Sequence, residues 1–351
     1  MNDHTKYMKR CLELAKNGLG LVYPNPMVGS VLVHNGLIIG EGWHQKAGCS
    51  HAEVNAIDSV KNKALLPKAT LYVNLEPCSH HGRTPPCADL IISSGIKKVV
   101  IGAADTNKQV GGKGIKRLRE NGVEVVMHVL EKEARELNKR FFTFHEKKRP
   151  YVILKWAQSK DGYIFPDASR VEKGIPYWIS NSYSLQRVHQ WRSEEASILV
   201  GTRTVRQDNP KLNIRDFTGN SILRIAIDRK LELSSSLNFF DGSSDTIIFN
   251  ELKDEKIERL HYVQLDFSKD LVAQIMRHLH KIEIQSLIIE GGAYTLNAFI
   301  ASNLWDEARI FQGDQYFEGG LKAPVINTDQ IYEEHLGKDI LRIYKNSQDE
   351  K

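Results

Sequence analysis

The stretch His51-Ala52-Glu53, followed by Glu76-Pro77-Cys78 and then by Cys87, decides the fold of the first half of the chain. One imidazole and two thiolates form a three-ligand zinc site that leaves the fourth tetrahedral position to water, the pattern of catalytic zinc. Zinc lowers the pKa of such a water to about 7, which gives hydroxide at neutral pH. Glu53 can take the proton from that water and deliver it to a ring nitrogen and to departing ammonia. The stretch therefore predicts a zinc-dependent aminohydrolase.

Other arrangements of this metal site remain open. A closed structural site would use His80 or His81 as the fourth ligand, but Glu53 would then have no role. Cys49 is a rival ligand because it lies two residues before His51, although we expect it to be a small packed residue ahead of the helix. A catalytically inactive, zinc-stabilised binding module is a further reading, and the presence of Glu53 argues against it.

Strand and helix signals alternate around this site. Two apolar runs flank Asn35-Gly36, the strongest short signal of a β-hairpin, and a helix should begin near His51. We expect an opening helix with apolar spacing over 7–15, strands at 69–77, 97–105 and 123–129, and helices at 87–95, 114–122 and 131–140. Such alternation predicts an α/β layered sheet.

The charged stretch at residues 145–150 marks a domain boundary. We therefore expect a deaminase domain over 1–147 and a second α/β domain over 148–351. The second half should contain a helix at 182–194 and strands at 151–157, 197–202, 222–228, 245–250, 286–292 and 306–312.

Composition excludes several classes of protein. Four cysteines in 351 residues are too few for a disulfide framework and predict a reducing, cytoplasmic location. No apolar run approaches the ~18 residues of a membrane span, and the charged start is not a secretory signal. Residues 1–149 contain 23 Lys or Arg against 14 Asp or Glu, which suits a phosphorylated or nucleic-acid substrate. We expect much of this excess, from Lys132 to Arg149, to be a solvated face and a linker.

Three segments of the first half, 23–29, 42–53 and 77–87, resemble the deaminase domain of bifunctional riboflavin-biosynthesis deaminase/reductases. General cytidine and tRNA-adenosine deaminases usually keep two residues between their cysteines, whereas the eight found here are this family's own variant. The resemblance implies a cytidine-deaminase-like α/β/α domain that removes an amino group from 2,5-diamino-6-ribosylamino-4(3H)-pyrimidinone 5′-phosphate. It implies a small-molecule substrate and no nucleic acid or membrane partner, and a homo-oligomer is compatible with it. The substrate contacts that it implies are Asn25, His44, His80, Arg83 and Asp105.

The second half resembles the same family's reductase domain, whose fold is similar to dihydrofolate reductase. The resemblance is carried by Lys155, Ser159-Lys160-Asp161-Gly162, Gly201–Val205, Asp208-Asn209-Pro210 and Glu290-Gly291-Gly292. It implies that NADPH reduces the ribosyl group of the deaminated product to ribityl, with Lys155 and Asp208 as catalytic residues. The implied substrate contacts are Arg192, Leu212, Arg215 and Glu290. The implied cofactor contacts are Gln158, Trp178, Thr204, Asp208, Arg229, Gly292, Ala293, Tyr294, Thr295, Leu296, Asn297 and Ala298.

Alternatives remain for the second half. No Gly-x-Gly-x-x-Gly follows a strand, so a standard dinucleotide fold is not indicated. Gly291-Gly292 opens a helix whose backbone amides can hold a pyrophosphate, or it is simply a tight connection. Lys155 lies in an apolar strand, where a lysine is rarely buried without a partner, unless it faces outward from an edge. The runner-up for the whole chain is a nucleoside or nucleic-acid deaminase with an unrelated C-terminal domain; the first half lacks the cysteine spacing and the interleaved aromatic and basic residues expected of it.

Overall fold

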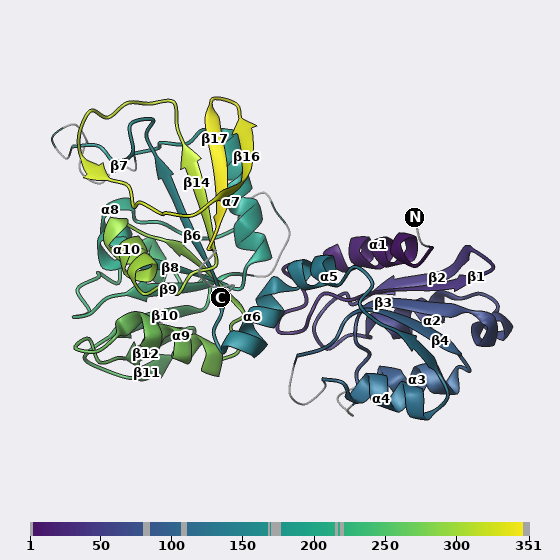
Figure 1. Ribbon diagram of the computed structural model, residues 1–351. Coiled ribbons are helices and arrows are strands. Elements are labelled where there is room, and N and C mark those ends of the chain that lie inside the picture. The colour runs from purple at the N-terminus through teal and green to yellow at the C-terminus, as the bar shows by residue number, and fades with distance from the viewer. Residues whose placement is uncertain are drawn as a thin grey trace. The chain divides into compact units, whose positions relative to one another are not determined.

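The computed structural model describes residues 3–79, 85–106, 111–167, 169, 177–214, 217 and 221–346. The chain divides into two compact units, Met1–Lys148 and Arg149–Lys351 (Figure 1). Both units are built from strands and helices in alternation, which confirms the predicted α/β class. Among the described residues, no helix is long and apolar enough to cross a membrane.

The first unit is built on a five-stranded sheet with the order β2-β1-β3-β4-β5. β1 pairs antiparallel with β2 and β3, whereas β3, β4 and β5 run parallel. Asn35 (φ 51°) and Gly36 (φ 77°) both adopt the left-handed conformation that a two-residue hairpin turn requires, so the predicted hairpin is confirmed. The strands are β1 (Gly29–His34), β2 (Leu37–Trp43), β3 (Thr70–Leu75), β4 (Lys98–Ala103) and β5 (Glu124–Val126).

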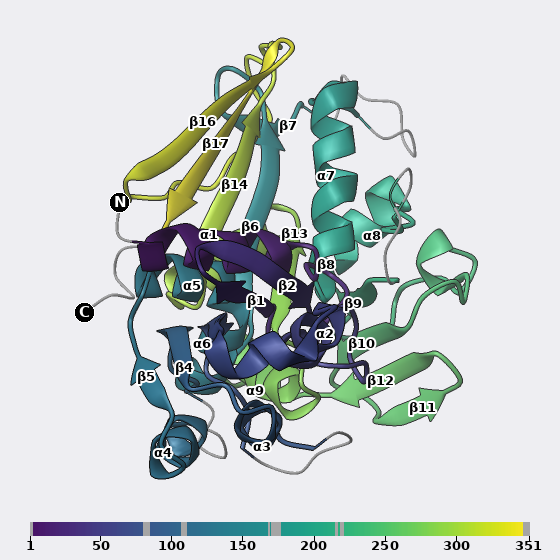
Figure 2. The same cartoon turned by 90° about the vertical axis from the view of Figure 1, so that its right-hand side faces the viewer.

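Helices cover both faces of this sheet, and α1 and α2 lie on opposite sides of it (Figure 2). Successive side chains of a strand point to opposite faces, so Val31 and Val33 of β1 pack with α1 while Leu32 packs with α2. The expected helix at 131–140 is two helices, and the second extends to Lys147, so the charged stretch at 145–150 begins inside a helix. The helices are α1 (Asp3–Lys16), α2 (Ala52–Ser59), α3 (Cys87–Ser93), α4 (Lys113–Glu120), α5 (Glu131–Leu137) and α6 (Lys139–Lys147), with a 3-10 turn at Lys63–Lys68.

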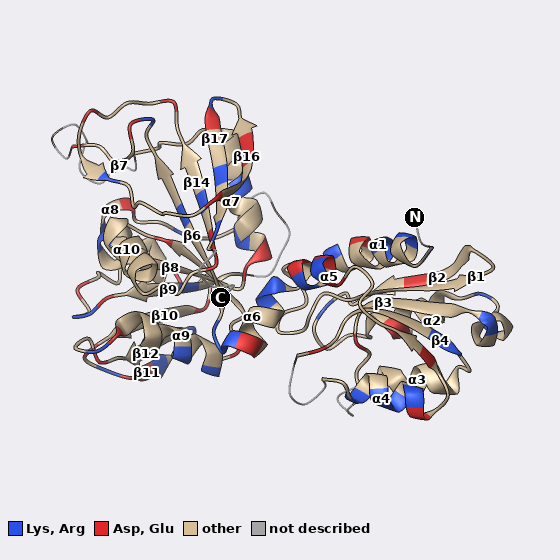
Figure 3. Ribbon diagram, in the orientation of Figure 1, with Lys and Arg blue, Asp and Glu red and all other residues tan. Residues whose placement is uncertain are grey.

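Part of the basic excess of this unit lies on α4. Lys113, Lys116, Arg117 and Arg119 are all exposed on this helix (Figure 3). Arg117 contacts Asp89, and Lys116 lies 3.8 Å from Glu120. This part of the excess, which lies outside the stretch from Lys132 to Arg149, forms a solvated helix face.

The second unit contains a ten-stranded sheet with the order β11-β12-β10-β9-β8-β13-β6-β14-β17-β16. The strands from β12 to β14 in this order run parallel, and β11, β17 and β16 are added antiparallel at the two edges. The strands are β6 (Tyr151–Gln158), β8 (Ser197–Gly201), β9 (Leu223–Ile227), β10 (Thr246–Asn250), β11 (Glu255–Ile257), β12 (Leu260–Gln264), β13 (Ser286–Glu290), β14 (Glu307–Gln312), β16 (Gln330–Leu336) and β17 (Asp339–Lys345). A separate pair joins β7 (Tyr163–Phe165) to β15 (Leu321–Lys322).

Two apolar clusters hold helices against the two faces of this sheet. One cluster joins α9 and α10 to residues such as Leu154 and Leu287, and the other joins α7 and α8 to residues such as Ile153 and Ile288. The predicted helix at 182–194 is confirmed, whereas α8 and α9 were not predicted. The helices are α7 (Ser182–Glu194), α8 (Thr202–Asp208), α9 (Leu271–Lys281) and α10 (Ala293–Ala301), with a 3-10 turn at Asn238–Phe240.

The expectation of a solvated linker is wrong for Arg149. This residue is 5% exposed, and its two terminal guanidinium nitrogens donate to the carboxylate oxygens of Asp306 at 2.5 and 2.8 Å. The partner lies 157 residues away in the sequence, so a local reading of the charged run could not find it. A buried arginine is retained because this two-point pairing satisfies its charge.

Candidate active sites

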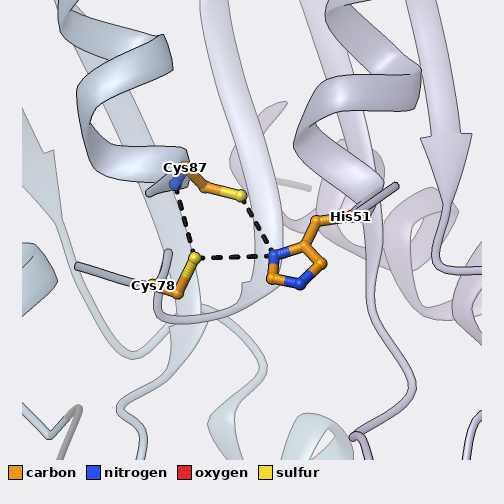
Figure 4. A group of neighbouring side chains, drawn as sticks. All are labelled: His51, Cys78 and Cys87. Carbon is orange, nitrogen blue, oxygen red and sulfur yellow. Dashed lines mark hydrogen bonds between the residues drawn. The ribbon is translucent and has the colours of Figure 1, made fainter. Parts of the chain in front are cut away.

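Three side chains of the first unit converge, as Figure 4 shows: His51, Cys78 and Cys87. His51 precedes α2, Cys78 follows β3, and Cys87 opens α3. The Nδ1 atom of His51 lies 3.2 Å from the Cys87 sulfur and 3.5 Å from the Cys78 sulfur, and the three ligand atoms all lie within 4.8 Å of one another. One imidazole nitrogen and two sulfurs at this spacing fit Zn²⁺ with one coordination position left open.

Hydrogen bonding prepares Cys78 to bind a metal. The Cys87 thiol and His51 donate to its sulfur and lower the pKa of Cys78, and the backbone N–H of Cys87 donates to the same sulfur at 3.3 Å. The thiolate is the form that binds metal. Cys49 is exposed and does not belong to the cluster formed by the described residues, so the expectation that it is packed is wrong.

Glu53 lies in the first turn of α2, two residues after His51, and is 3% exposed. Burial raises the pKa of its carboxyl to about 7, and the carboxyl shares a hydrogen bond with the side chain of Cys87. A group with a pKa near neutrality can both accept and return a proton at physiological pH, as general acid–base catalysis requires. The position and the protonation of Glu53 therefore suit a proton carrier beside the metal.

Asn25 and His44 form a hydrogen-bonded chain next to the cluster. The Nδ1 atom of His44 lies 3.1 Å from the carbonyl oxygen of Ser50, which can only accept, so Nδ1 carries the proton. Burial lowers the pKa of His44 and favours this neutral form. Its Nε2 atom then accepts a hydrogen bond from the Asn25 side-chain amide at 3.0 Å. The rings of His44 and His51 pack edge to face, with their centroids 5.5 Å apart. The amide oxygen of Asn25 is thereby given a defined orientation.

Glu76 is a buried residue of this site to which no role was assigned from the sequence. It is 4% exposed, and it ties the segment that carries Cys78 to the start of α4. Its carboxylate oxygens accept backbone N–H groups at 2.9–3.2 Å from Asp105, Gly112, Gly114 and Ile115. The available signals were a carboxylate at the end of a buried strand and a glycine-rich Gly111–Gly114 downstream. A Cβ at position 114 would lie 2.0 Å from the carbonyl oxygen of Pro77, so this close approach needs glycine.

Three residues with an implied substrate role lie outside the described residues: His80, Arg83 and Arg215. His81, the other candidate for a fourth metal ligand, lies outside them as well. Asp105 is described, and its backbone N–H is one of the four that Glu76 holds.

The second unit contains a cavity of 1090 Å³. It lies where β6, β8 and β13 end, because its lining includes residues near the end of β6, residues of α8, the helix that follows β8, and Gly291 and Gly292, which directly follow β13. Ligands of parallel α/β sheets bind at these carboxyl ends. The residues of the expected site that line the cavity are Lys155, Trp178, Arg192, Thr204, Asp208, Glu290 and Gly292.

Glu290 links two cations at the floor of this cavity. Both Nε and a terminal nitrogen of Arg192 donate to its carboxylate, at 3.3 and 2.8 Å, and the Lys155 ammonium lies 3.7 Å away. Burial alone would raise the pKa of Glu290, but the charges of Arg192 and Lys155 lower it to about 2. Burial lowers the pKa of Lys155. β6 lies between β13 and β14, so the alternative that Lys155 faces outward from an edge is wrong.

Several residues with an implied role do not line the cavity. Arg229 donates to the Glu251 carboxylate at 2.7 Å. Leu212 is 4% exposed in an apolar cluster and has a left-handed backbone (φ 49°). Gln158 accepts from the indole N–H of Trp156, which itself lines the cavity. The residues from Ala293 to Ala298 form the first turns of α10 behind Gly292.

The wall around Gly292 is shaped to receive an anionic ligand. Gly292 is the N-cap of α10, where backbone N–H groups are left free for a phosphate. Its own N–H donates to the Thr204 hydroxyl at 3.1 Å, which joins α10 to α8. A Cβ at Gly201 would lie 2.8 Å from the Thr295 hydroxyl oxygen, so glycine lets the end of β8 approach α10 closely. These features fit a nicotinamide dinucleotide.

The Ser-x-Asp-Gly turn after β6 acts on Trp178 indirectly. Asp161 accepts from the Ser159 hydroxyl and from the backbone N–H groups of Phe317 and Glu318, and these bonds, that from Ser159 first, lower the pKa of Asp161 to about 2. Gln315, in the same loop, donates to the carbonyl oxygen of Trp178 at 3.2 Å. The turn therefore holds the loop against which the Trp178 segment rests.

Family models match most of the chain. Residues 1–103 match the cytidine and deoxycytidylate deaminase zinc-binding region, and residues 150–330 match the RibD C-terminal domain. The second match makes the alternative of an unrelated C-terminal domain wrong.

Curated relatives and solved structures agree with these matches. The riboflavin biosynthesis protein RibD of Aquifex aeolicus (strain VF5) is 40% identical over 353 residues, with 97% of each chain covered. RibD of Escherichia coli (strain K12) is 34% identical, covering 87% of this chain and 86% of its own. The crystal structure of a diaminohydroxyphosphoribosylaminopyrimidine deaminase/5-amino-6-(5-phosphoribosylamino)uracil reductase from Thermotoga maritima is 38% identical, with a TM-score of 0.88 and 98% of each chain covered. The chain therefore belongs to the RibD family of bifunctional riboflavin-biosynthesis deaminase/reductases.

Proposed function

We propose that this enzyme acts on one pyrimidine phosphate in two steps, with Zn²⁺ and NADPH as its cofactors. The first step removes an amino group from 2,5-diamino-6-ribosylamino-4(3H)-pyrimidinone 5′-phosphate. The second reduces the ribosyl side chain of the product to ribityl. The observation that carries the proposal is the convergence of His51, Cys78 and Cys87 beside the buried Glu53 carboxyl in a chain that also holds the RibD reductase domain.

In the deaminase unit, Glu53 is the proton carrier. Zn²⁺ held by His51, Cys78 and Cys87 supplies Lewis-acid activation of water. Glu53 accepts one proton from the attacking water as the new C–O bond forms and gives it to the ring nitrogen. It then takes the second proton from the new hydroxyl group and gives it to the amino group, so that the carbonyl forms, the C–N bond breaks and ammonia leaves.

Asn25 and His44 orient the pyrimidine in this scheme. His44, fixed by Ser50, presents an acceptor nitrogen to the Asn25 amide. The amide oxygen of Asn25, with its remaining N–H, is then free to pair with a ring edge that offers both a donor and an acceptor. This pairing would select a pyrimidine and place the carbon that bears the amino group over the metal.

In the reductase unit, Lys155 is the proton donor. NADPH supplies a hydride to C1′ of the opened, imine-like sugar. The buried Lys155 ammonium has a lowered pKa and gives a proton to the substrate nitrogen, which leaves a saturated C–N bond. Glu290, which is itself fixed by Arg192, pairs with Lys155, and Asp208, whose pKa burial raises, also lines the cavity.

Two single variants test the two halves independently. Glu53→Gln should abolish ammonia release from the diaminopyrimidine phosphate but leave NADPH oxidation with the deaminated product intact. Lys155→Met should have the opposite effect. Ammonia release by Glu53→Gln at the wild-type rate would refute the assigned proton carrier, and a wild type that oxidises no NADPH with the product would refute the reductase function. Deamination of free cytidine at a comparable rate would instead favour a nucleoside deaminase.

We also propose a cytoplasmic location. All four cysteines are free, and two of them belong to the metal cluster. A reducing compartment keeps such thiols available for metal.

A further inference from the structure

The charges that line the reductase cavity do not balance. Its described lining contains three cations, Lys155, Arg192 and Arg203, against two carboxylates, Asp208 and Glu290. Lys155 and Arg192 both pair with Glu290. In the part of the chain that the structure describes, no carboxylate or hydrogen-bond acceptor engages the Arg203 guanidinium within the distances of an ion pair or a hydrogen bond. Arg203 is therefore the one cation of the described lining whose charge has no carboxylate partner, and the lining as a whole carries one positive charge in excess.

This freedom distinguishes Arg203 from its neighbours. Arg206, one helical turn further along α8, pairs with Glu232 at 3.0 Å. Arg229 pairs with Glu251 at 2.7 Å. Neither of these two arginines lines the cavity. Of Arg203, Arg206 and Arg229, only Arg203 lines the cavity, and only its guanidinium is not paired with a described carboxylate.

The position of Arg203 places it on the wall expected to bind the cofactor. It precedes Thr204, whose hydroxyl accepts the Gly292 N–H, so α8 is fastened to the start of α10 (Figure 1). Gly291 and Gly292 line the cavity together with Arg203. Lys155 and Glu290, beside which the substrate sugar is proposed to bind, lie instead on β6 and at the end of β13.

We propose that Arg203 binds a phosphate group of the nicotinamide cofactor. The proposal rests on the reductase function proposed above. A guanidinium presents paired N–H donors that match two phosphate oxygens, and it stays charged at every physiological pH. In Rossmann-type sites, an arginine accommodates the 2′-phosphate that distinguishes NADPH from NADH, and the same chemistry applies in another fold. The pyrimidine substrate also carries a phosphate monoester, so the experiment must separate the two sources.

Binding of the cofactor alone, without the pyrimidine, provides that separation. Trp156 and Trp178 line the cavity, so tryptophan emission reports its occupancy directly. The full-length wild type, Arg203→Gln, Arg203→Lys and the control Arg206→Gln would each be titrated with NADPH and with NADH. The control removes the same charge from the same helix outside the cavity. The urea-unfolding midpoint of each preparation, followed by tryptophan emission, verifies that the reductase unit is folded, because four of the five tryptophans lie in that unit.

We expect Arg203→Gln to weaken NADPH binding by about tenfold or more, because it removes a charged hydrogen-bond donor. Arg203→Lys should recover part of the affinity, and Arg206→Gln should bind like the wild type. If NADH binding is unaffected, Arg203 binds the 2′-phosphate, and if both cofactors weaken equally, it binds the pyrophosphate; both results support the proposal.

Three results would overturn it. Arg203→Gln could bind NADPH with wild-type affinity. It could instead raise only the KM for the pyrimidine phosphate, which would assign Arg203 to the substrate. A wild type that binds no NADPH would refute the reductase function and this assignment together, and so is distinguished from the first two results.

Discussion

The carboxylate of Glu76 holds together the loops of the deaminase unit, and Glu76→Gln tests how much that hold contributes. One oxygen accepts from Gly114 and Ile115, and the other accepts from Asp105 and Gly112. The glutamine amide keeps one acceptor oxygen, but its NH₂ group faces two backbone N–H donors that can no longer bond. A hydrogen bond to a charged group contributes about 1.5–3 kcal/mol, so the loss of two should destabilise the unit by about 3 kcal/mol or more.

The two activities of the chain make this loss measurable with an internal control. For a unit of this size, a loss of about 3 kcal/mol lowers the midpoint temperature of thermal unfolding by about 6–12 °C. Samples would be heated, cooled and assayed for both ammonia release and NADPH oxidation. The ammonia-release midpoint should fall in Glu76→Gln, while the NADPH-oxidation midpoint should stay at its wild-type value. Hydrogen exchange of the peptide covering 113–120 should rise in parallel.

Glu120→Gln is a matched control, because Glu120 is an exposed glutamate on α4 whose only described ion pair is with Lys116 at 3.8 Å. It should leave both midpoints within about 2 °C of wild type, since exposed pairs contribute little. If Glu76→Gln behaved like Glu120→Gln, the four backbone contacts would not contribute to stability as argued. If both activities fell together, the effect would not be confined to the deaminase unit.

Two further variants test the metal cluster and the buried charges. Cys87→Ser removes one of three ligands, so zinc content after dialysis, measured by atomic emission, should fall well below that of the wild type; equal retention would contradict the assigned cluster. Burial favours the neutral form of Glu290, but the charges of Arg192 and Lys155 lower its pKa to about 2 from 4.5, so its stabilising charge is fully present above pH 4.5 and is lost as the pH falls towards 2. Glu290→Gln should be less stable than the wild type by about 3 kcal/mol at pH 6, and this gap should shrink by about 2 kcal/mol at pH 3. Urea unfolding followed by tryptophan emission measures it, because four of the five tryptophans lie in the second unit; a gap independent of pH would contradict the assigned pairing.

Features that depend on neighbouring residues were predictable from the sequence. The turn at Asn35-Gly36 needs two left-handed residues, and few residue types other than asparagine and glycine adopt that conformation readily. The helix predicted at 182–194 has the bounds of α7, Ser182–Glu194. The metal cluster was predictable because imidazole and thiolate have few other reasons to occur in that order around a glutamate. The short helix α8 was missed, since seven residues between a strand and a turn carry little periodic signal.

The sequence by itself determined the alternating α/β architecture, the hairpin and the chemical identity of the zinc ligands, because local periodicity and side-chain chemistry are sufficient for each. Only the tertiary structure decided which charges are neutralised. Arg192 and Glu290 are 98 residues apart in the chain, and their pairing depends on α7 packing beside the end of β13. The same holds for Glu76, whose partners lie 29 to 39 residues away, and for Arg203, whose guanidinium no described carboxylate neutralises. Electrostatic pairing acts through space, so a linear sequence records the charges without recording their distances.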